Sequence, residues 1–243
     1  MMESEWRLDR WLAKAGIGSR KDVKKLLKKK RVKQNGQVVT DASAKVHIEQ
    51  DTITLDGNPI TANTGPIYLL MNKQKNRVSA TTDAENVTVL ADVEEQLRAD
   101  LFPVGRLDKD TEGLLLLTSD GDFAHRLTSP KYEIEKEYEV TLDERPADEE
   151  LQALEKGIQL KDGTVTKPAK LQPDDESDKP IVTITLTEGK YHQVKRMFGA
   201  LGRRVTELKR IRIGSLLLDE DLKPGEYREL TSDELENLFR SIH

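Results

Sequence analysis

The sequence predicts an α+β protein built from a small N-terminal module and a larger second domain with a mixed, mainly antiparallel sheet. Three observations support this. Two helical patterns followed by short strand patterns occupy the N-terminal region. A small, polar stretch at residues 61–66 then interrupts the patterning, as a linker does. Beyond it, strands and helices mix without the regular alternation of a parallel sheet. We place the boundary between residues 63 and 64, which gives domains 1–63 and 64–243.

The first module begins with two predicted helices. Apolar residues at helical spacing predict the first, and they are Leu8, Trp11, Leu12 and Ala15. Ser19 is a typical N-cap for the second, since its hydroxyl can accept the N–H three residues later. Short strands follow, because Asn35-Gly36 supplies the positive φ angles of a two-residue hairpin turn. A further strand at Thr52–Leu55 ends at another turn, Asp56-Gly57.

The second domain mixes both kinds of element. Strand patterns are predicted at residues 67–71, 113–118, 139–142 and 181–187. Helical patterns are predicted at residues 87–97, 148–156 and 192–201.

Charge is distributed unevenly along the chain. The formal net charge is −5 over 243 residues. Between Trp6 and Gly36, however, twelve Lys or Arg face two Asp, so this segment carries +10 and the remainder about −15. A basic surface on an acidic body can still bind phosphates, which favours RNA as the partner. A solvated helix face is the alternative.

Composition narrows the chemistry further. The chain has no cysteine, which excludes disulfides, thiolate nucleophiles and cysteine-ligated metals. Apolar runs such as Leu114–Leu117 are too short to span a bilayer, and residues 1–6 lack the apolar core of a signal peptide. We therefore expect a cytoplasmic protein without membrane contact.

The segment Gly105–Gly113 is the strongest candidate for chemistry. Two glycines bracket a polar stretch that runs directly into an apolar strand, as in a functional loop presented by a rigid scaffold. Asp108, Asp110 and Glu112 leave a divalent metal site as one alternative, and a plain charged turn as another. The four histidines form no metal-ligand pair at helical spacing, and no glycine-rich nucleotide loop is present.

Residues 188–197 form a second candidate, because stacking, hydrogen-bonding and cationic groups gather at the start of a predicted helix. An ordinary amphipathic helix entry is the alternative. Tyr138, within Lys136–Val140, is a weaker candidate, and the pattern alone favours a strand core residue there.

Taken together, these segments resemble the RsuA-type rRNA pseudouridine synthases, which carry an S4-like RNA-binding module ahead of the catalytic domain. The resemblance spans about Arg7 to Leu230. The matching blocks are Arg7-Leu8-Asp9-Arg10, Ser19-Arg20, Asn35-Gly36, GRLDKDTEGLLLLTSDG at 105–121, Lys136-x-Tyr138, EGKYHQVKRM at 188–197 and Pro224-Gly225-Glu226-Tyr227-Arg228. It implies the pseudouridine synthase fold and a cofactor-free, metal-free isomerase.

The resemblance also implies the site residues. The family's catalytic aspartate corresponds to Asp108, its active-site tyrosine to Tyr138 and its basic partner to Lys195, where related synthases often have arginine. We expect Lys195 to lower the pKa of that carboxylate. Arg106 matches the arginine that fills the space left by the flipped uridine.

The predicted RNA-binding set is wider. Besides Arg106 it comprises Arg7, Ser19, Arg20, Lys25, Lys29, Lys30, Arg31, Asn35, Lys73, His192, Gln193 and Arg196. One segment departs from the family pattern: Asn72-Lys73-Gln74-Lys75-Asn76 stands where members often read Asn-Lys-Pro-x-Gly. The backbone shape of that loop is therefore left open.

The implied partner is ribosomal RNA, with small-subunit (16S) rRNA favoured by overall similarity, in a monomeric enzyme. A large-subunit (23S) synthase and a non-catalytic ribosome-assembly factor are the alternatives. Two chemical routes also remain open, since Asp108 can attack the base or assist cleavage at the sugar.

Overall fold

The computed structural model describes residues 5–62 and 65–242, and the chain forms two compact units. The first comprises Met1–Pro66 together with Glu94–Ala99, and the second comprises Ile67–Val93 and Asp100–His243. The predicted domain boundary at residues 63 and 64 lies outside the described residues. Each unit has its own hydrophobic core and is considered separately.

Two helices of the first unit pack on small strands. They are α1 (Leu8–Lys14) and α2 (Arg20–Lys28), and their apolar stripes bury Leu8, Leu12 and Leu27 completely. Ser19 caps α2 as predicted, because its hydroxyl accepts the Asp22 N–H at 3.3 Å. The short helix α3 (Glu95–Arg98) also belongs to this unit.

The strands of the first unit form two small antiparallel sheets. One pairs β1 (Glu5–Arg7) with β4 (Lys45–His47). The other has the order β3-β2-β5-β6, built from β2 (Val32–Gln34), β3 (Gln37–Val38), β5 (Ile53–Leu55) and β6 (Asn58–Ile60). Asn35 and Gly36 adopt φ angles of 52° and 81°, so the hairpin turn predicted between β2 and β3 is confirmed.

A nine-stranded mixed sheet organises the second unit, with a main path β11-β12-β10-β13-β9-β7-β15. Its strands are β7 (Tyr68–Lys73), β8 (Phe102–Val104), β9 (Glu112–Thr118), β10 (Lys136–Leu142), β11 (Lys170–Pro173), β12 (Ile181–Leu186), β13 (Val205–Ile213), β14 (Leu216–Leu217) and β15 (Tyr227–Glu229). Every pairing is antiparallel except that of β9 with β13. The predicted α+β class with a mainly antiparallel mixed sheet is therefore confirmed.

The β9–β13 junction joins the two halves of this sheet at unusually close range. Gly113 pairs with Arg210, and a Cβ placed on Gly113 would lie 2.2 Å from the Arg210 carbonyl oxygen. The φ angle of Gly113 is +101°, a region that side chains disfavour. The junction therefore requires a residue without a side chain.

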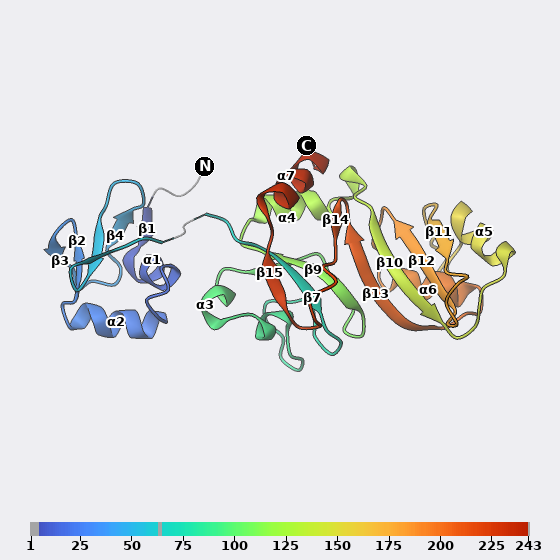
Figure 1. The fold of residues 1–243 in the computed structure, drawn as a ribbon, viewed down its shortest axis with the longest axis horizontal. Coiled ribbons are helices and arrows are strands. Elements are labelled where there is room, and N and C mark those ends of the chain that lie inside the picture. The colour runs from blue at the N-terminus through green and yellow to red at the C-terminus, as the bar shows by residue number, and fades with distance from the viewer. Residues whose placement is uncertain (1–4, 63–64, 243) are drawn as a thin grey trace. The chain divides into compact units, whose positions relative to one another are not determined.

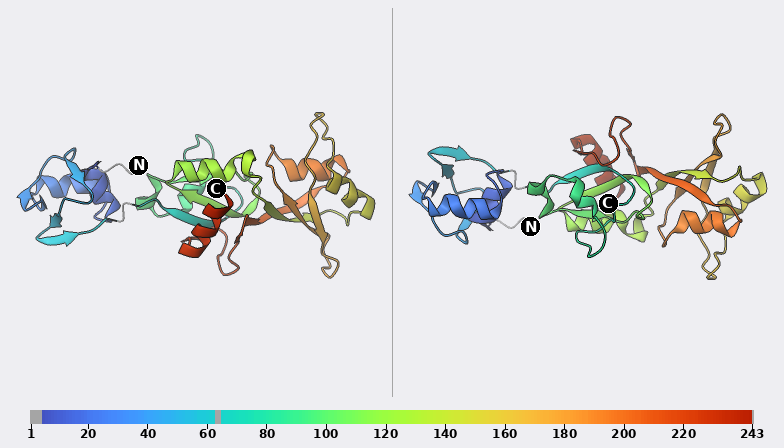
Figure 2. Two further views of the ribbon diagram at one scale, coloured as in Figure 1. Left: turned by 90° about the horizontal axis from the view of Figure 1, so that it is seen from above. Right: turned by 90° about the horizontal axis from the view of Figure 1, so that it is seen from below.

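The remaining helices are distributed over both halves of the sheet. They are α4 (Gly121–Thr128), α5 (Asp148–Lys156), α6 (Gln193–Ala200) and α7 (Ser232–Ser241), with 3-10 turns at Val89–Asp92 and Pro130–Tyr132. In Figure 1, α4 and α7 lie by the β7–β9–β15 half, whereas α5 and α6 lie by the β10–β12 half. Figure 2 shows α4 and α6 on the same side of the sheet.

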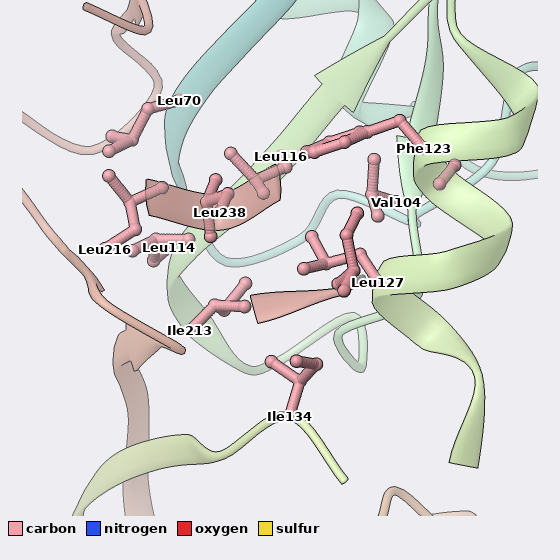
Figure 3. Packing of buried hydrophobic residues seen from close by; sticks show 12 residues of the cluster. Leu70, Val104, Leu114, Leu116, Phe123, Leu127, Ile134, Ile213, Leu216 and Leu238 are labelled. Carbon is pink, nitrogen blue, oxygen red and sulfur yellow. The ribbon is translucent and has the colours of Figure 1, made fainter. Parts of the chain in front are cut away.

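In the core of the β7–β9–β15 half of the sheet, helices α4 and α7 pack against the strands. Phe123 and Leu127 of α4 meet Leu238 of α7 over Leu114 and Leu116 of β9 (Figure 3). This packing buries β9, the strand that follows the loop at residues 105–111.

One predicted helix is wrong in its extent. Residues 87–97 form a 3-10 turn followed by the separate helix α3, because Val93 and Glu94 adopt extended backbone between them. Burial of Val93 favours this break, since tertiary packing overrides the weak helical pattern. None of the helices in residues 5–62 and 65–242 combines the length and apolar character needed to cross a membrane.

Candidate active site

The loop between β8 and β9 presents Arg106 and Asp108 on either side of a buried anchor. Leu107 is buried, and its N–H and carbonyl both bond to the hydroxyl of Ser79, at 3.1 and 3.0 Å. Thr111 N–H donates to the Asp108 carbonyl at 3.1 Å and closes a tight turn. Anchoring Leu107 in this way fixes the backbone from which the Arg106 and Asp108 side chains project.

Lys73 stabilises the same loop from beneath. Its side chain is fully buried, and its ammonium donates to the carbonyls of Thr111 at 2.7 Å, Gln74 at 3.1 Å and Lys109 at 3.4 Å. Burial lowers the pKa of Lys73 to about 8. Lys73 is in the predicted RNA-binding set, but a buried ammonium bonded to three carbonyls cannot reach a phosphate. Its placement is that of a positioning residue for the Asp108 loop.

Asp108 meets two basic side chains from the start of α6. Its Oδ2 lies 3.3 Å from Lys195 Nζ, and its Oδ1 lies 3.6 Å from His192 Nε2. The Asp108 side chain is 26% exposed and that of Lys195 24%. Segments 87 residues apart thus converge, as the resemblance implies. The ammonium donates a hydrogen bond to the carboxylate, and the imidazole lies beside the other carboxylate oxygen.

Lys195 has a second and closer partner, Asp110, whose pairing with Lys195 was not predicted from the sequence. Asp110 Oδ1 lies 2.5 Å from the same ammonium, although the Asp110 side chain is 70% exposed. Partial burial raises the pKa of Asp110, but the hydrogen bond and charge of Lys195 outweigh this, so the net pKa is lowered. In the sequence, the spacing of Asp108, Asp110 and Glu112 indicates a divalent metal site as an alternative and does not indicate a shared cation.

Tyr138 and Asp108 line one small cavity of about 80 Å³. Tyr138 is nearly buried on β10, and apolar side chains of Leu186, Val194 and Leu208 complete the wall. Tyr138, Asp108 and His192 therefore face a common space that both apolar and polar groups line. The exposed Arg106 stands at its rim.

A hydrogen-bonded turn sets the entry to α6. Glu188 accepts from Lys190 Nζ and from Gln193 Nε2, each at 2.6 Å, and Gln193 Oε1 accepts the Lys190 N–H at 2.8 Å. Gln193 is buried and its side chain shapes this turn, but it also lines the cavity that contains Asp108, so its contact with RNA stays a prediction. His192 takes a left-handed conformation, with φ of 49°, which directs its ring toward Asp108.

Tyr191 is an exposed aromatic residue that the predicted set omitted. Its side chain is 76% exposed, and its ring stacks on that of His192 with centroids 3.8 Å apart. The sequence does contain a signal for this residue, because Tyr191 is an aromatic residue directly next to His192, which is predicted to bind RNA. The pair forms a flat surface next to Asp108.

Several predicted RNA-binding side chains are engaged within the protein. Arg7 pairs with Asp9 at 3.0 Å, Lys25 with Asp22 at 2.9 Å and Arg196 with Asp162 at 2.5 Å. Arg31 pairs with Asp56, and the Asn35 amide bonds to Asp51 at 2.7 Å. In contrast, Arg20, Lys29 and Lys30 are exposed around α2. These three are the members of the set most available to phosphates.

The metal alternative receives no support from the geometry. Asp108 and Asp110 share Lys195, and Glu112 lies 3.3 Å from Lys75. Across the part of the chain that the structure describes, no group of three or more His, Asp or Glu side chains is arranged to hold a metal ion.

Comparisons with known proteins identify the family of this chain. Residues 67–200 match the family described as RNA pseudouridylate synthase, and residues 6–53 match the S4 domain. A protein of Bacillus subtilis described as an uncharacterized RNA pseudouridine synthase is 46% identical over 94% of this chain and 96% of its own length. Ribosomal small subunit pseudouridine synthase A of Yersinia pestis is 45% identical over 94% of this chain and 96% of its own.

The corresponding synthase A of Escherichia coli is 43% identical over 94% of this chain and 98% of its own length. A solved structure, described as the crystal structure of pseudouridylate synthase, superposes with a TM-score of 0.68 at 40% identity. It covers 96% of this chain and 99% of that one.

Proposed function

Because the chain belongs to the RNA pseudouridylate synthase family and is an RNA pseudouridine synthase, we propose that it isomerises one uridine of small-subunit ribosomal RNA. The relatives from Yersinia pestis and Escherichia coli are named for that subunit. The observation that carries the proposal is the convergence of Asp108, Lys195 and His192 beside Tyr138 at one cavity.

The reaction conserves every atom of the nucleotide. The N1–C1′ bond breaks, the uracil turns, the C5–C1′ bond forms, and the C5 proton is lost while N1 gains one. In our proposal Asp108 supplies the carboxylate that adds to the base or assists at C1′, and Lys195 holds it in place. The ring of Tyr138 packs on the uracil, and its hydroxyl helps to move the C5 proton.

Arg106 is proposed to support flipping of the target uridine. A paired uridine must leave the stack before it can enter the Asp108 cavity, which costs a few kcal/mol. The guanidinium of Arg106 is exposed two residues from Asp108, where it can stack and donate in the vacated space.

We also propose that the boundary between the two domains lies between residues 63 and 64.

The first unit is proposed to bind RNA through its basic surface. We expect Lys29→Gln combined with Lys30→Gln to weaken rRNA binding and to reduce the salt slope by about two, because two phosphate contacts are lost. Gln keeps a side chain at position 30, where φ is 57°, so the backbone strain is unchanged. Filter binding between low and high salt measures the slope.

The matched control for this pair is Lys156→Gln with Lys161→Gln, which removes two exposed lysines from the other unit. If both double variants change the slope equally, the α2 surface has no special part in binding.

Tyr191 is proposed to stack on a base beside the target. We expect Tyr191→Ala to raise KM roughly 5- to 100-fold with little change in kcat, since one base-stacking contact is worth about 1–3 kcal/mol. Tyr191→Phe keeps the ring and should keep KM. A fall in kcat with unchanged KM, or equal behaviour of the two variants, would contradict a stacking role.

The substrate assignment is tested by mapping pseudouridines. Transcripts of both rRNAs, and a small-subunit assembly intermediate, are incubated with the protein and analysed by carbodiimide-dependent primer extension. We expect one new stop in small-subunit rRNA. A stop in large-subunit rRNA alone would show that the substrate is large-subunit rRNA and would contradict the proposal.

The proposed site draws Asp108, Tyr138 and Lys195 from a single chain. We therefore also propose a monomeric enzyme that works where its rRNA is made, in the cytoplasm.

A further inference from the structure

A second cavity adjoins the one that contains Asp108. Its volume is about 380 Å³, and the side chains and backbone that line both cavities belong to Arg106, Tyr138, Glu188, Gly189 and Lys190. The proposed mechanism uses only the smaller cavity. The larger one therefore lies against the same wall without an assigned role.

Two basic side chains from neighbouring strands line this second cavity. Arg210 on β13 is the register partner of Tyr138 on β10, and Lys136 lies two residues before Tyr138. Side chains two residues apart in a strand project on one face, so Lys136 shares the face of Tyr138. The two cations thus line the wall directly beside the proposed catalytic tyrosine.

Arg210 is 3% exposed, yet part of its guanidinium has no partner. Its Nε donates to the Leu114 carbonyl at 2.8 Å, whereas its Nη2 lacks a hydrogen bond. Lys136 Nζ donates only to the Ile134 carbonyl, at 2.9 Å, among the bonds that the structure describes for it. Within the described residues, Arg210 Nη2 and Lys136 Nζ therefore carry hydrogen-bond donors that the protein does not satisfy, and the Nη2 atom is itself almost wholly buried in the cavity wall.

Nearby carboxylates are already committed to other cations. Glu188 also lines the cavity but lies 2.6 Å from Lys190. Glu135 and Glu137 pair with Arg212 at 3.2 and 2.7 Å. Within residues 5–62 and 65–242, neither Lys136 nor Arg210 has a carboxylate partner.

Placing two cations together away from water is costly unless an anion accompanies them. Burial and the charge of Arg210 lower the pKa of Lys136 to about 8, as expected for uncompensated positive charge. The lining of the same cavity also includes Thr128, Ser129 and the apolar Val104, Leu127 and Ile213. The cavity thus combines a cationic end with an apolar side, and its size suits a nucleotide.

We propose that this cavity is a phosphate subsite, in which Arg210 and Lys136 bind a backbone phosphodiester next to the flipped uridine of the RNA substrate. This inference rests on the proposed function. A nucleotide held in the Asp108 cavity is necessarily flanked by two phosphodiesters, so one of them can enter the adjoining space. Charge-assisted bonds from a guanidinium and an ammonium suit that group, and the apolar wall then contacts its ribose.

The test removes the charge of one phosphate at a time. Short target RNAs each carry a single methylphosphonate at one linkage near the uridine, and kcat/KM is measured with the wild-type protein. We expect one flanking position to lose roughly 10- to 100-fold, corresponding to a charged hydrogen bond of about 1.5–3 kcal/mol. If no flanking linkage is sensitive beyond remote ones, the proposal is overturned.

Lys136→Met then identifies the protein partner. It removes the ammonium but keeps a chain of similar length, whereas replacing Arg210 would also break its bond to Leu114. In the Lys136→Met protein, we expect the methylphosphonate at the sensitive linkage to lower kcat/KM by less than 3-fold relative to the same protein with unmodified RNA. In the Lys136→Arg protein, we expect the same fall in kcat/KM as in the wild-type protein. An unchanged penalty in Lys136→Met overturns the assignment. Failure of the proposed function is distinguishable, because wild-type protein would then form no pseudouridine even in unmodified RNA.

Discussion

Asp108→Asn is expected to abolish pseudouridine formation while leaving RNA binding within about 2-fold of the wild type. Asparagine keeps the shape of the side chain but removes the charge that the proposed chemistry requires at N1–C1′ cleavage. Loss of a group that acts directly on the reacting atoms typically reduces kcat by roughly 10³- to 10⁵-fold. Single-turnover conversion of target rRNA measures the loss, and gel-shift titration measures binding.

Asp110→Asn is the matched control for this experiment. Asp110 binds the same ammonium at 2.5 Å and is two residues away, but its side chain is 70% exposed. Its removal should leave Lys195 to Asp108 alone and reduce turnover by less than about 10-fold. Turnover retained in Asp108→Asn, or lost equally in Asp110→Asn, would remove Asp108 from its proposed role.

Gly113→Ala is expected to destabilise the second unit by at least about 3 kcal/mol. The new Cβ would meet the Arg210 carbonyl at 2.2 Å, and the φ angle of +101° is itself unfavourable for alanine. The parallel β9–β13 pairing would have to open, which separates the Asp108 loop from the half of the sheet that carries Tyr138. A fall of roughly 10 °C in Tm and loss of activity should follow together.

Gly121→Ala is the corresponding control, since nothing lies within 4 Å of a Cβ added at the first residue of α4. Its stability should remain unchanged or rise slightly, because alanine favours the helix. Thermal unfolding followed by circular dichroism compares the two variants, and hydrogen exchange at β9 and β13 locates the opening. A Gly113→Ala protein as stable as Gly121→Ala would mean that the junction relaxes without cost.

The contacts of Gly113 with Arg210 and of Asp110 with Lys195 lie beyond the reach of local sequence patterns. The cap at Ser19, the turn at Asn35-Gly36 and the apolar strand after Gly113 were all predictable, because each depends on bonds or backbone angles within a few residues. The 87–97 helix was wrong for the complementary reason: burial of Val93 decided the backbone there, and burial depends on distant chain segments.

Within the site, the motifs named Asp108, Tyr138 and Lys195 only through resemblance to a family, and their catalytic roles stay proposals. Local patterning identified the polar loop around Asp108 but could not say which cation would meet it. Lys73 and Gln193 look like surface residues in the sequence, yet both are buried and hold the backbone of the site.

By itself, then, the sequence determined the local elements, the two-part organisation expected of the chain and the family that its motifs match. The tertiary structure alone decided that Lys195 is shared between two carboxylates and that Lys136 and Arg210 line a second cavity, where neither has an acidic partner among the residues that the structure describes. The physical reason is the distance along the chain between the residues that interact. Caps, turns and strand alternation arise from neighbouring residues, whereas charge pairing and burial depend on which distant strands the fold brings side by side.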